Sequence, residues 1–143
     1  MPFYPGFGIG GFCLPQNPYY LMHQLKNPEV EMPILSKSIN ILNNRPIKKA
    51  YHFMKYNNIL IMGIGFKAGQ TITAFSPSLT IYKELKYNNK NVTLYDIDNN
   101  KEKYTLEYIK QYDCIIIGYI PEDFNKGILF DYQMENYGSV FKF

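Results

Sequence analysis

The chain has 143 residues, of which 46% are hydrophobic and 19% are charged, and its formal net charge at pH 7 is +3. This length and composition predict one globular domain that can bury a single hydrophobic core. The Lys and Arg residues are spread along the chain and the longest apolar runs are about six residues, so neither nucleic-acid binding nor a membrane span is expected.

Glycine and proline are concentrated in residues 1–31, where we expect an ordered loop followed by a short helix over Pro18–Leu25. A second helix is predicted over Pro33–Asn43, because proline suits a first helical turn, whose amide hydrogens have no partner within the helix. A turn at residues 43–46 follows, and Pro46 is expected to open a third helix that reaches Lys55. Apolar residues recur at spacings of three and four in both longer helices.

From Asn58 onward, short apolar runs of the kind found in buried parallel strands alternate with helical patterns. The expected elements are strands over Ile59–Met62, Val92–Tyr95 and Cys114–Ile117, helices from Pro77 to Asn88 and over Glu102–Gln111, a helical turn at Phe124–Lys126, a candidate fourth strand over Ile128–Phe130 and an extended tail over Ser139–Phe143.

This alternation is typical of right-handed βαβ units, and it predicts an α/β fold. We expect residues 57–143 to form a small Rossmann-like, three-layer domain with a parallel sheet of three or four strands. Residues 1–56 are expected to form a separate lead-in, made of a glycine-rich loop and helices.

The segment Gly63-Ile-Gly65-Phe-Lys-Ala68 fits the pattern GxGxx[GA] of dinucleotide-binding turns, and it follows a predicted strand. In that motif the helix begins at the glycine turn, so that its N-terminus faces the pyrophosphate. Here the helix start signal is Ser76-Pro77, eight residues after Ala68, and the acidic residue Asp96 comes later than the motif requires. We therefore favour a simple glycine turn at the end of a buried strand over an NAD site.

The two cysteines, Cys13 and Cys114, do not suggest a disulfide framework, and no secretory signal is expected, so a cytoplasmic location is predicted. Cys13 has three interpretations. A nucleophile would need a nearby cation or a helix N-terminus, and a metal ligand would need partners, which His23 and His52 do not supply at a ligand spacing. Spacing alone favours the third interpretation, a small buried hydrophobic residue.

The sequence FYPGFGIGGFCLP at residues 3–15, with PYYL at residues 18–21, resembles the catalytic cysteine loop of the UDP-glucose/GDP-mannose dehydrogenase family. The loop is closest to the UDP-N-acetylhexosamine 6-dehydrogenase type, which reads FYPGPGxGGHCIPVDPYYL. Residues 61–67, IMGIGFK, and residues 76–79, SPSL, are similar to the family's segment LGLAFKPNTDDVRESPAL. A weaker third match covers residues 112–118 and 128–131, which resemble the last strands of the nucleotide-sugar domain.

The resemblance implies that the chain corresponds to the C-terminal portion of an enzyme that oxidises the C6 alcohol of a nucleotide sugar twice with NAD, through a thioester on the cysteine. It implies that residues 57–143 bind a UDP-sugar and that Cys13 is the nucleophile if activity is retained. It also implies no cofactor on this chain alone, because the family's NAD domain lies before the matched portion. The substrate-binding residues that it implies are Tyr4, Gly6, Gly8, Gly10, Gly11 and Lys67.

Several charged groups of the family's pattern are absent. Asn17 stands where the family has Asp, and an amide cannot take a proton from water at neutral pH. Ala74 stands where the family has Arg, Phe12 stands where it has His, and Asp131 is followed by Tyr132 rather than Arg. We therefore expect a truncated and degenerate relative that lacks dehydrogenase activity on its own.

Two other functions remain open at this point. The chain could be one subunit of a split enzyme, in which a separate chain supplies the NAD domain and Cys13 is catalytic. Alternatively, it could be a structural or interaction protein that associates with itself through an exposed apolar surface, and a homo-oligomer is expected.

Overall fold

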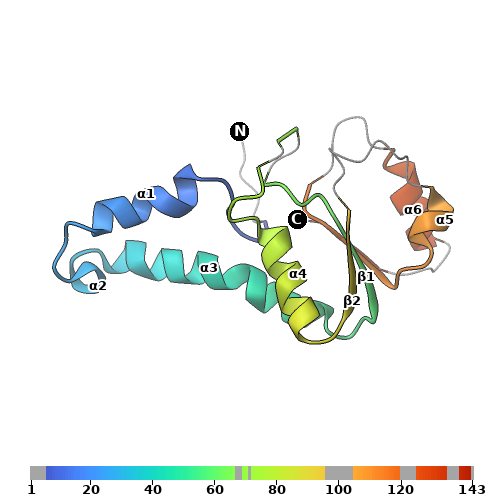
Figure 1. The fold of residues 1–143 in the computed structure, drawn as a ribbon, viewed down its shortest axis with the longest axis horizontal. Coiled ribbons are helices and arrows are strands. Elements are labelled where there is room, and N and C mark those ends of the chain that lie inside the picture. The colour runs from blue at the N-terminus through green and yellow to red at the C-terminus, as the bar shows by residue number, and fades with distance from the viewer. Residues whose placement is uncertain are drawn as a thin grey trace.

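The structure is a computed structural model, and it describes residues 6–66, 69–70, 72–95, 105–119, 125–134 and 139–142. Its centre is a four-stranded sheet in which every pairing is parallel, in the order β2-β1-β3-β4 (Figure 1). The strands are β1 (Asn58–Met62), β2 (Asn91–Tyr95), β3 (Cys114–Ile117) and β4 (Ser139–Lys142). The predicted α/β fold with a parallel sheet is therefore confirmed.

Successive side chains of β1 point to opposite faces of the sheet and enter two separate clusters, as the period of a strand requires. Ile59 and Ile61 belong to the first cluster, together with residues of α3 (Pro33–Phe53) and α4 (Pro77–Tyr87). Leu60 belongs to the second cluster, together with residues of α5 (Leu106–Ile109) and α6 (Gly127–Met134). Helices therefore cover both faces of the sheet, which explains why β1 and β3 are continuous apolar runs.

Helix α4 begins and ends where the sequence predicts. The Ser76 hydroxyl accepts a hydrogen bond from the Leu79 amide at 3.3 Å, and Pro77 occupies the first turn. Asn88 follows the last helical residue, and Asn89 takes the left-handed conformation, with φ +59°, that often ends a helix. The predicted helix over Glu102–Gln111 is described only from Thr105 onward, where α5 begins with a Thr105 cap.

The helices before the sheet differ from the prediction. Helix α1 spans Cys13–Met22 rather than Pro18–Leu25, and a short helix α2 spans Pro28–Glu31. The predicted turn at residues 43–46 does not form, since α3 continues through Pro46 to Phe53. Proline inside a helix removes a hydrogen bond, but Pro46 is buried against the glycine loop, and this packing offsets the cost.

The end of the chain is also different. Residues 128–130 lie in helix α6 rather than in a strand, because Leu129 and Tyr132, one turn apart, both face the second core cluster. The fourth strand is instead β4, in the segment that was expected to be a tail, and it pairs with β3. A short apolar run fits a strand or one face of a helix equally well, and only packing decides.

Helix α1, helix α2 and the part of α3 before Pro46 project from the sheet as an elongated two-layer extension, which we call the arm (residues 12–45; Figure 1). The rest of α3 belongs to the body of the molecule, because Ala50 and Phe53 share a core cluster with Ile59. The predicted division at residue 56 remains a prediction. No helix in the described ranges is long and apolar enough to cross a membrane.

Candidate functional site

The glycine loop, residues 6–11, packs tightly against the body of the molecule. A side chain at Gly8 would lie 3.3 Å from the Pro46 ring, and one at Gly10 would lie 2.7 Å from Cβ of Phe66. Phe7 is buried and meets the Phe53 ring edge-on, with ring centroids 6.2 Å apart. These glycines therefore let the loop backbone approach its neighbours closely, which is a structural role that the sequence does not reveal.

One backbone hydrogen bond joins the cysteine loop to the segment that follows β1. The Gly11 amide donates to the Ala74 carbonyl at 2.9 Å, and Gly11 has φ +81°, which favours glycine. The Phe66 ring lies against Gly11, and exposed Phe75 has φ +53°, an uncommon conformation for a bulky side chain. The two segments that resemble the dehydrogenase motifs are thus neighbours in the fold.

Cys13 is the first residue of α1 and it is exposed to solvent. The interpretation of Cys13 as a buried hydrophobic residue is therefore wrong, because α1 lies on the surface of the arm and turns the thiol outward. Asn17 lies one helical turn further along α1 and is also exposed. Residues four apart in a helix share a face, so the amide that replaces the family's carboxylate lies on the same side of α1 as the thiol.

The carboxyl ends of β1 and β3 come together under the N-terminus of α4. A side chain at Gly118 would meet the hydroxyl of Ser78 and would lie 2.5 Å from the carbonyl oxygen of Gly63. Gly63 itself has φ +80°, and a side chain there would lie 2.9 Å from the carbonyl oxygen of Tyr119. Because the chain passes from β1 to β2 on one side and β3 lies on the other, this is the switch point where open parallel sheets usually bind ligands.

The pattern GxGxx[GA] at Gly63–Ala68 does not form a dinucleotide-binding turn. Helix α4 begins at Pro77 rather than at the glycines, as the sequence predicts. The described residues between Gly63 and Ser76 are not helical, so within the described residues no helix begins directly after the glycines, as the motif requires.

Three predicted or discussed side chains, Tyr4, Lys67 and Asp96, lie outside the described residues, and their roles remain predictions. Gly6, Gly8, Gly10 and Gly11 form one continuous loop that ends beside Cys13. His23 and His52 are exposed, at the ends of α1 and α3 respectively. Within the described ranges, no three His, Cys, Asp or Glu side chains gather in a way that could hold a metal ion.

The other thiol is not available for chemistry. Burial and, to a smaller extent, the neighbouring charge of Asp113 raise the pKa of Cys114 to about 12. Burial also raises the pKa of Tyr132, whose hydroxyl donates to the carbonyl oxygen of Tyr112. Both groups stay neutral at physiological pH, as expected of residues in a hydrophobic core.

Sequence reasoning missed two residues that position this region. The Arg45 Nε donates to the Gly6 carbonyl at 2.6 Å and so ties the start of the loop to α3. Ser78, in the first turn of α4, is buried at the switch point and faces Gly118. A long-range side-chain contact leaves no spacing signal, although the small residue at position 78 is consistent with close packing.

A shallow hollow lies on the arm, away from the glycine loop, and is lined by Pro33, Ile34, Lys37 and Ser38.

Comparison with known proteins supports the cysteine-loop resemblance. The model of the UDP-glucose/GDP-mannose dehydrogenase family, central domain, matches residues 1–45. The UDP-N-acetyl-D-mannosamine dehydrogenase of Pyrococcus horikoshii is 26% identical, over 64% of this chain and 24% of that protein. The GDP-mannose 6-dehydrogenase of Pseudomonas aeruginosa is 24% identical, over 82% of this chain and 29% of that protein. The chain therefore spans about a quarter of the length of these curated relatives.

Solved structures show the same fold. The UDP-D-ManNAc dehydrogenase of Pyrococcus horikoshii matches with a TM-score of 0.69 and 23% identity, over 88% of this chain and 33% of that one. The GDP-mannose dehydrogenase ternary complex from Pseudomonas aeruginosa matches with a TM-score of 0.70 and 20% identity, over 96% of this chain and 36% of that one. The family model over residues 1–45 and these relatives, together with the cysteine loop, show that the chain is similar to proteins of the UDP-glucose/GDP-mannose dehydrogenase family.

Proposed function

We propose that this protein binds a nucleotide sugar where the cysteine loop meets the carboxyl ends of β1 and β3, and that it does not oxidise the sugar on its own. The observation that carries the proposal is the hydrogen bond between the Gly11 amide and the Ala74 carbonyl at 2.9 Å. It joins the loop that contains Cys13 to the segment that follows β1, so both family motifs contribute to one place.

The topology of the sheet supports a ligand at this place. The switch between β1 and β3 lies under the first turn of α4, and amide groups at a helix N-terminus favour an anionic group such as a diphosphate. Lys67 follows the described end of the β1 turn in the sequence, and we assign it the role of pairing with the ligand's negative charge.

The residues around the thiol support a loss of oxidation. Asn17 cannot act as the base that would hydrolyse a thioester, and Ala74 provides no fixed positive charge. The described residues between β1 and α4 form no helix, which does not suit a dinucleotide. Each missing charged group would cost on the order of 3 kcal/mol of transition-state stabilisation.

Calorimetric titration with UDP, UDP-N-acetylglucosamine, GDP-mannose and NAD tests binding. We expect heat with a nucleotide sugar, and a loss of at least about tenfold in affinity in Lys67→Ala. Lys83→Ala is the matched control, because Lys83 is an exposed lysine of α4, and it should bind like the wild type. No heat with any nucleotide would refute the binding proposal. NADH formation by the purified chain would refute the proposed inactivity.

A second candidate is a subunit of a split dehydrogenase, which the exposed position of Cys13 at the start of α1 favours. The test mixes this chain with the NAD-binding portion of the Pyrococcus horikoshii relative and follows NADH formation. Activity that disappears in Cys13→Ala and rises at least about tenfold in Asn17→Asp would support the split enzyme. Activity that Cys13→Ala leaves unchanged would exclude Cys13 as the nucleophile.

A further inference from the structure

Helix α3 presents to solvent a line of side chains in which apolar residues are interleaved with lysines. The positions recur at spacings of three and four, so they fall on one line along the helix, and every one of them is exposed. We call this line the outer stripe of α3, and its members are Ile34, Lys37, Ile41, Asn44, Lys48 and Tyr51. Lys55, the next position at the same spacing, lies just after the helix and is also exposed.

The opposite side of α3 makes the contacts with the rest of the molecule. The side chains of Ser36 and Asn43 donate hydrogen bonds to residues of α1, at 3.4 and 2.8 Å, and Ala50 and Phe53 belong to the first core cluster. An outer-stripe residue stands two positions before each of these four residues, which is about 200° around the helix. The outer stripe therefore lies on the far side of α3 from these contacts and faces solvent.

The fold gathers basic residues on one face of the sheet, although they are spread along the sequence. Residues 33–90 contain nine Lys or Arg residues and one acidic residue, whereas residues 91–143 contain five and nine respectively. Helix α3 contains no Asp or Glu, and α4, which packs beside it in the same core cluster, adds the exposed Lys83 and Lys86. On the other face, α5 and α6 each contain one acidic residue and no Lys or Arg. The two faces therefore differ in charge.

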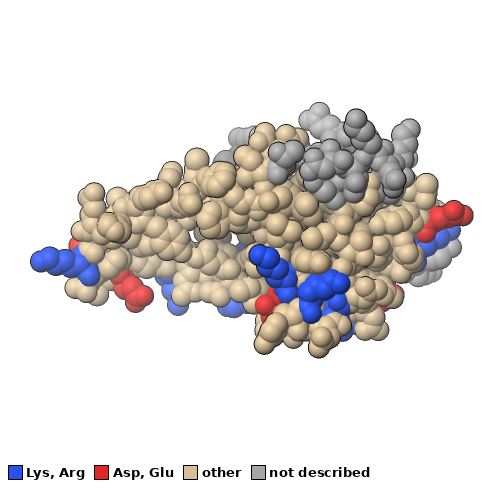
Figure 2. Space-filling view, in the orientation of Figure 1, with Lys and Arg blue, Asp and Glu red and all other residues tan. Residues whose placement is uncertain are grey.

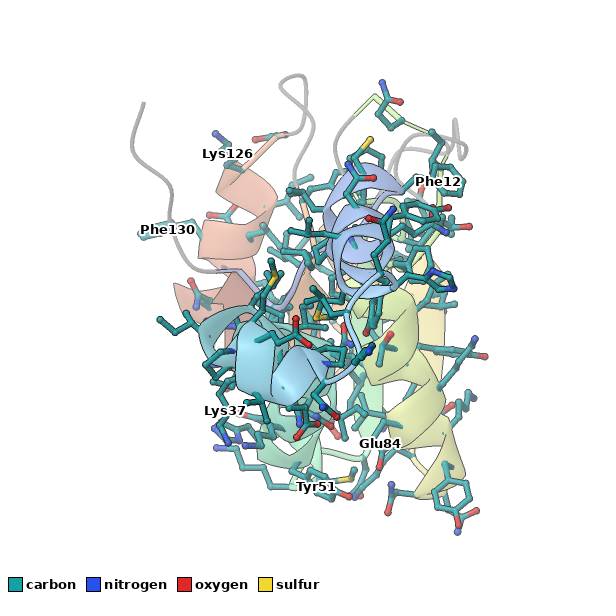
Figure 3. The ribbon with its side chains drawn as sticks, turned by 90° about the vertical axis from the view of Figure 1, so that its left-hand side faces the viewer. Phe12, Lys37, Tyr51, Glu84, Lys126 and Phe130 are labelled. Carbon is teal, nitrogen blue, oxygen red and sulfur yellow. The ribbon has the colours of Figure 1, made fainter. Side chains whose placement is uncertain are left out.

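The figures show the basic side of the molecule directly. In Figure 2, Lys and Arg side chains lie along the lower edge of the arm and over α4, and no charged side chain lies along the upper edge of the arm on that face. In Figure 3, Lys37 and Tyr51 lie on the lower side of the molecule, whereas Phe12 lies on the upper side. The acidic residue of this region, Glu84, is half-buried and accepts a hydrogen bond from the Asn88 side chain at 3.3 Å.

The kind of cation on this surface favours a broad anionic surface over nucleic acid. Arg45 is the only arginine in the sequence, and its Nε donates to the Gly6 carbonyl at 2.6 Å, so the cations of the outer stripe are lysines. Recognition of nucleic acid favours the planar fork of arginine, whereas lysine is a point charge on a flexible apolar stem. Lysine suits attraction to a surface on which negative charges are not fixed in position.

The apolar members of the outer stripe favour a lipid surface in particular. Ile34 is 83% exposed, Ile41 is 54% exposed and Tyr51 is 57% exposed. A bilayer buries such side chains at the boundary between headgroups and acyl chains, while neighbouring lysines extend their charged ends to the headgroups. Tyrosine is enriched at the same boundary because its ring is apolar and its hydroxyl is polar. A nucleic acid backbone would offer the isoleucines no apolar surface.

We propose that the outer stripe of α3 docks this protein on the surface of a bilayer that contains anionic lipids. The two isoleucines and Tyr51 enter the headgroup boundary, Lys37 and Lys48 pair with lipid phosphates, and the lysines of α4 add to the attraction. The acidic face with α5 and α6 points away, because the anionic surface repels it. The proposal does not rest on nucleotide-sugar binding, since the glycine loop packs on Pro46 at the inner side of α3.

Co-sedimentation with lipid vesicles tests the proposal. One set of vesicles is phosphatidylcholine alone, and in the other about one third of the lipid is phosphatidylglycerol. We expect binding to the second set only, and weaker binding as salt is raised from about 0.05 to about 0.5 M, because salt screens the lysines.

A pair of charge variants locates the contact. Lys37→Gln/Lys48→Gln should bind about thirtyfold more weakly, since each lysine at an anionic surface contributes about fivefold in affinity. Lys26→Gln/Lys126→Gln is the matched control, because it removes the same charge at exposed lysines outside the outer stripe and should stay within about twofold of the wild type. All four side chains are exposed, so both variants keep the core intact.

A fluorescent probe reports the depth of the stripe. The sequence has no tryptophan, so Tyr51→Trp places a single one in the outer stripe, and Phe130→Trp places a single one on α6 as the control. On the phosphatidylglycerol vesicles, we expect the emission of Tyr51→Trp to shift to shorter wavelength as the ring leaves water. The emission of Phe130→Trp should stay unchanged.

Several results would overturn the proposal. These are no binding to the phosphatidylglycerol vesicles, equal binding to phosphatidylcholine alone, a stripe variant that binds like its control, and an unchanged Tyr51→Trp emission on bound vesicles. Polyglutamate or single-stranded RNA that displaces the protein at a lower concentration than the vesicle lipid would assign the surface to an acidic protein or to a nucleic acid, and would also overturn it.

Discussion

The body and the arm of this molecule are built from similar apolar residues, but they use them in opposite ways. In the body, Ile59, Ile61 and Ile116 are completely buried between helices on both faces of the sheet. On the arm, Ile34 and Ile41 are more than half exposed. Whether an isoleucine of this chain is buried therefore depends on its position in the fold. The difference separates a body with a packed core from an arm whose large apolar side chains are exposed.

The largest expected difference comes from the same substitution in the two regions. Ile116→Ala removes a fully buried side chain and should lower the free energy of unfolding by about 2–5 kcal/mol. Ile34→Ala removes a side chain that is 83% exposed and should change it by less than about 0.5 kcal/mol. Urea denaturation at low protein concentration measures the free energy of unfolding of both variants. Equal losses would contradict the difference in packing between the body and the arm.

The pH dependence of stability should also report on the body. The pKa of Cys114 is raised to about 12 in the folded chain from 9.0, so only the unfolded state ionises between these values. This contribution to stability is fully present below pH 9.0 and is lost as the pH rises through about 12.

Cys114→Val should therefore remove part of the loss of stability at alkaline pH. Between pH 8 and pH 10.5 we expect the wild type to lose about 2 kcal/mol more than the variant does. Denaturant titrations at the two pH values give this difference. The same loss in both proteins would show that the thiol ionises freely and that the body is less well packed than the structure shows.

The junction between arm and body depends on glycine. Gly10→Ala would place a methyl group 2.7 Å from Cβ of Phe66 and should lower stability by about 1–3 kcal/mol. Gly6→Ala is the control, since its nearest neighbour is 3.8 Å away, and it should be nearly neutral. Thermal unfolding compares the two variants, and an equally stable Gly10→Ala would mean that the loop does not pack as described.

The smallest effect is expected at the cap of α4. Ser76→Ala removes the hydroxyl that accepts from the Leu79 amide and should cost about 1 kcal/mol. Ser38→Ala, at an exposed position within the arm part of α3, should be neutral or slightly stabilising because alanine favours a helix. Circular dichroism melts of both variants measure this contrast.

Local pattern predicted much of the body correctly. Strands β1, β2 and β3 follow from short apolar runs that end at Gly63, Asp96 and Gly118, and α4 follows from the Ser76-Pro77 start signal. These elements could be predicted because a strand buried on both faces and a capped helix both leave their marks on adjacent residues. The cysteine-loop resemblance likewise depends on consecutive residues, and the family comparison confirms it.

The site could be predicted only in part. Its loop residues are adjacent in the sequence and so appear as a motif, but the Arg45 contact to Gly6 spans 39 residues and leaves no local signal. The exposure of Cys13 was predicted wrongly, since burial depends on whether another segment covers α1. The roles of Tyr4 and Lys67 remain predictions.

The sequence by itself thus determined the parallel α/β body, the extent of α4 and the family that the cysteine loop resembles. Tertiary structure alone decided that α3 passes through Pro46, that residues 128–130 are helical and that residues 139–142 complete the sheet. The physical reason is the same in each case. Proline and short apolar runs allow two local conformations of similar free energy, and contacts between distant segments select one of them.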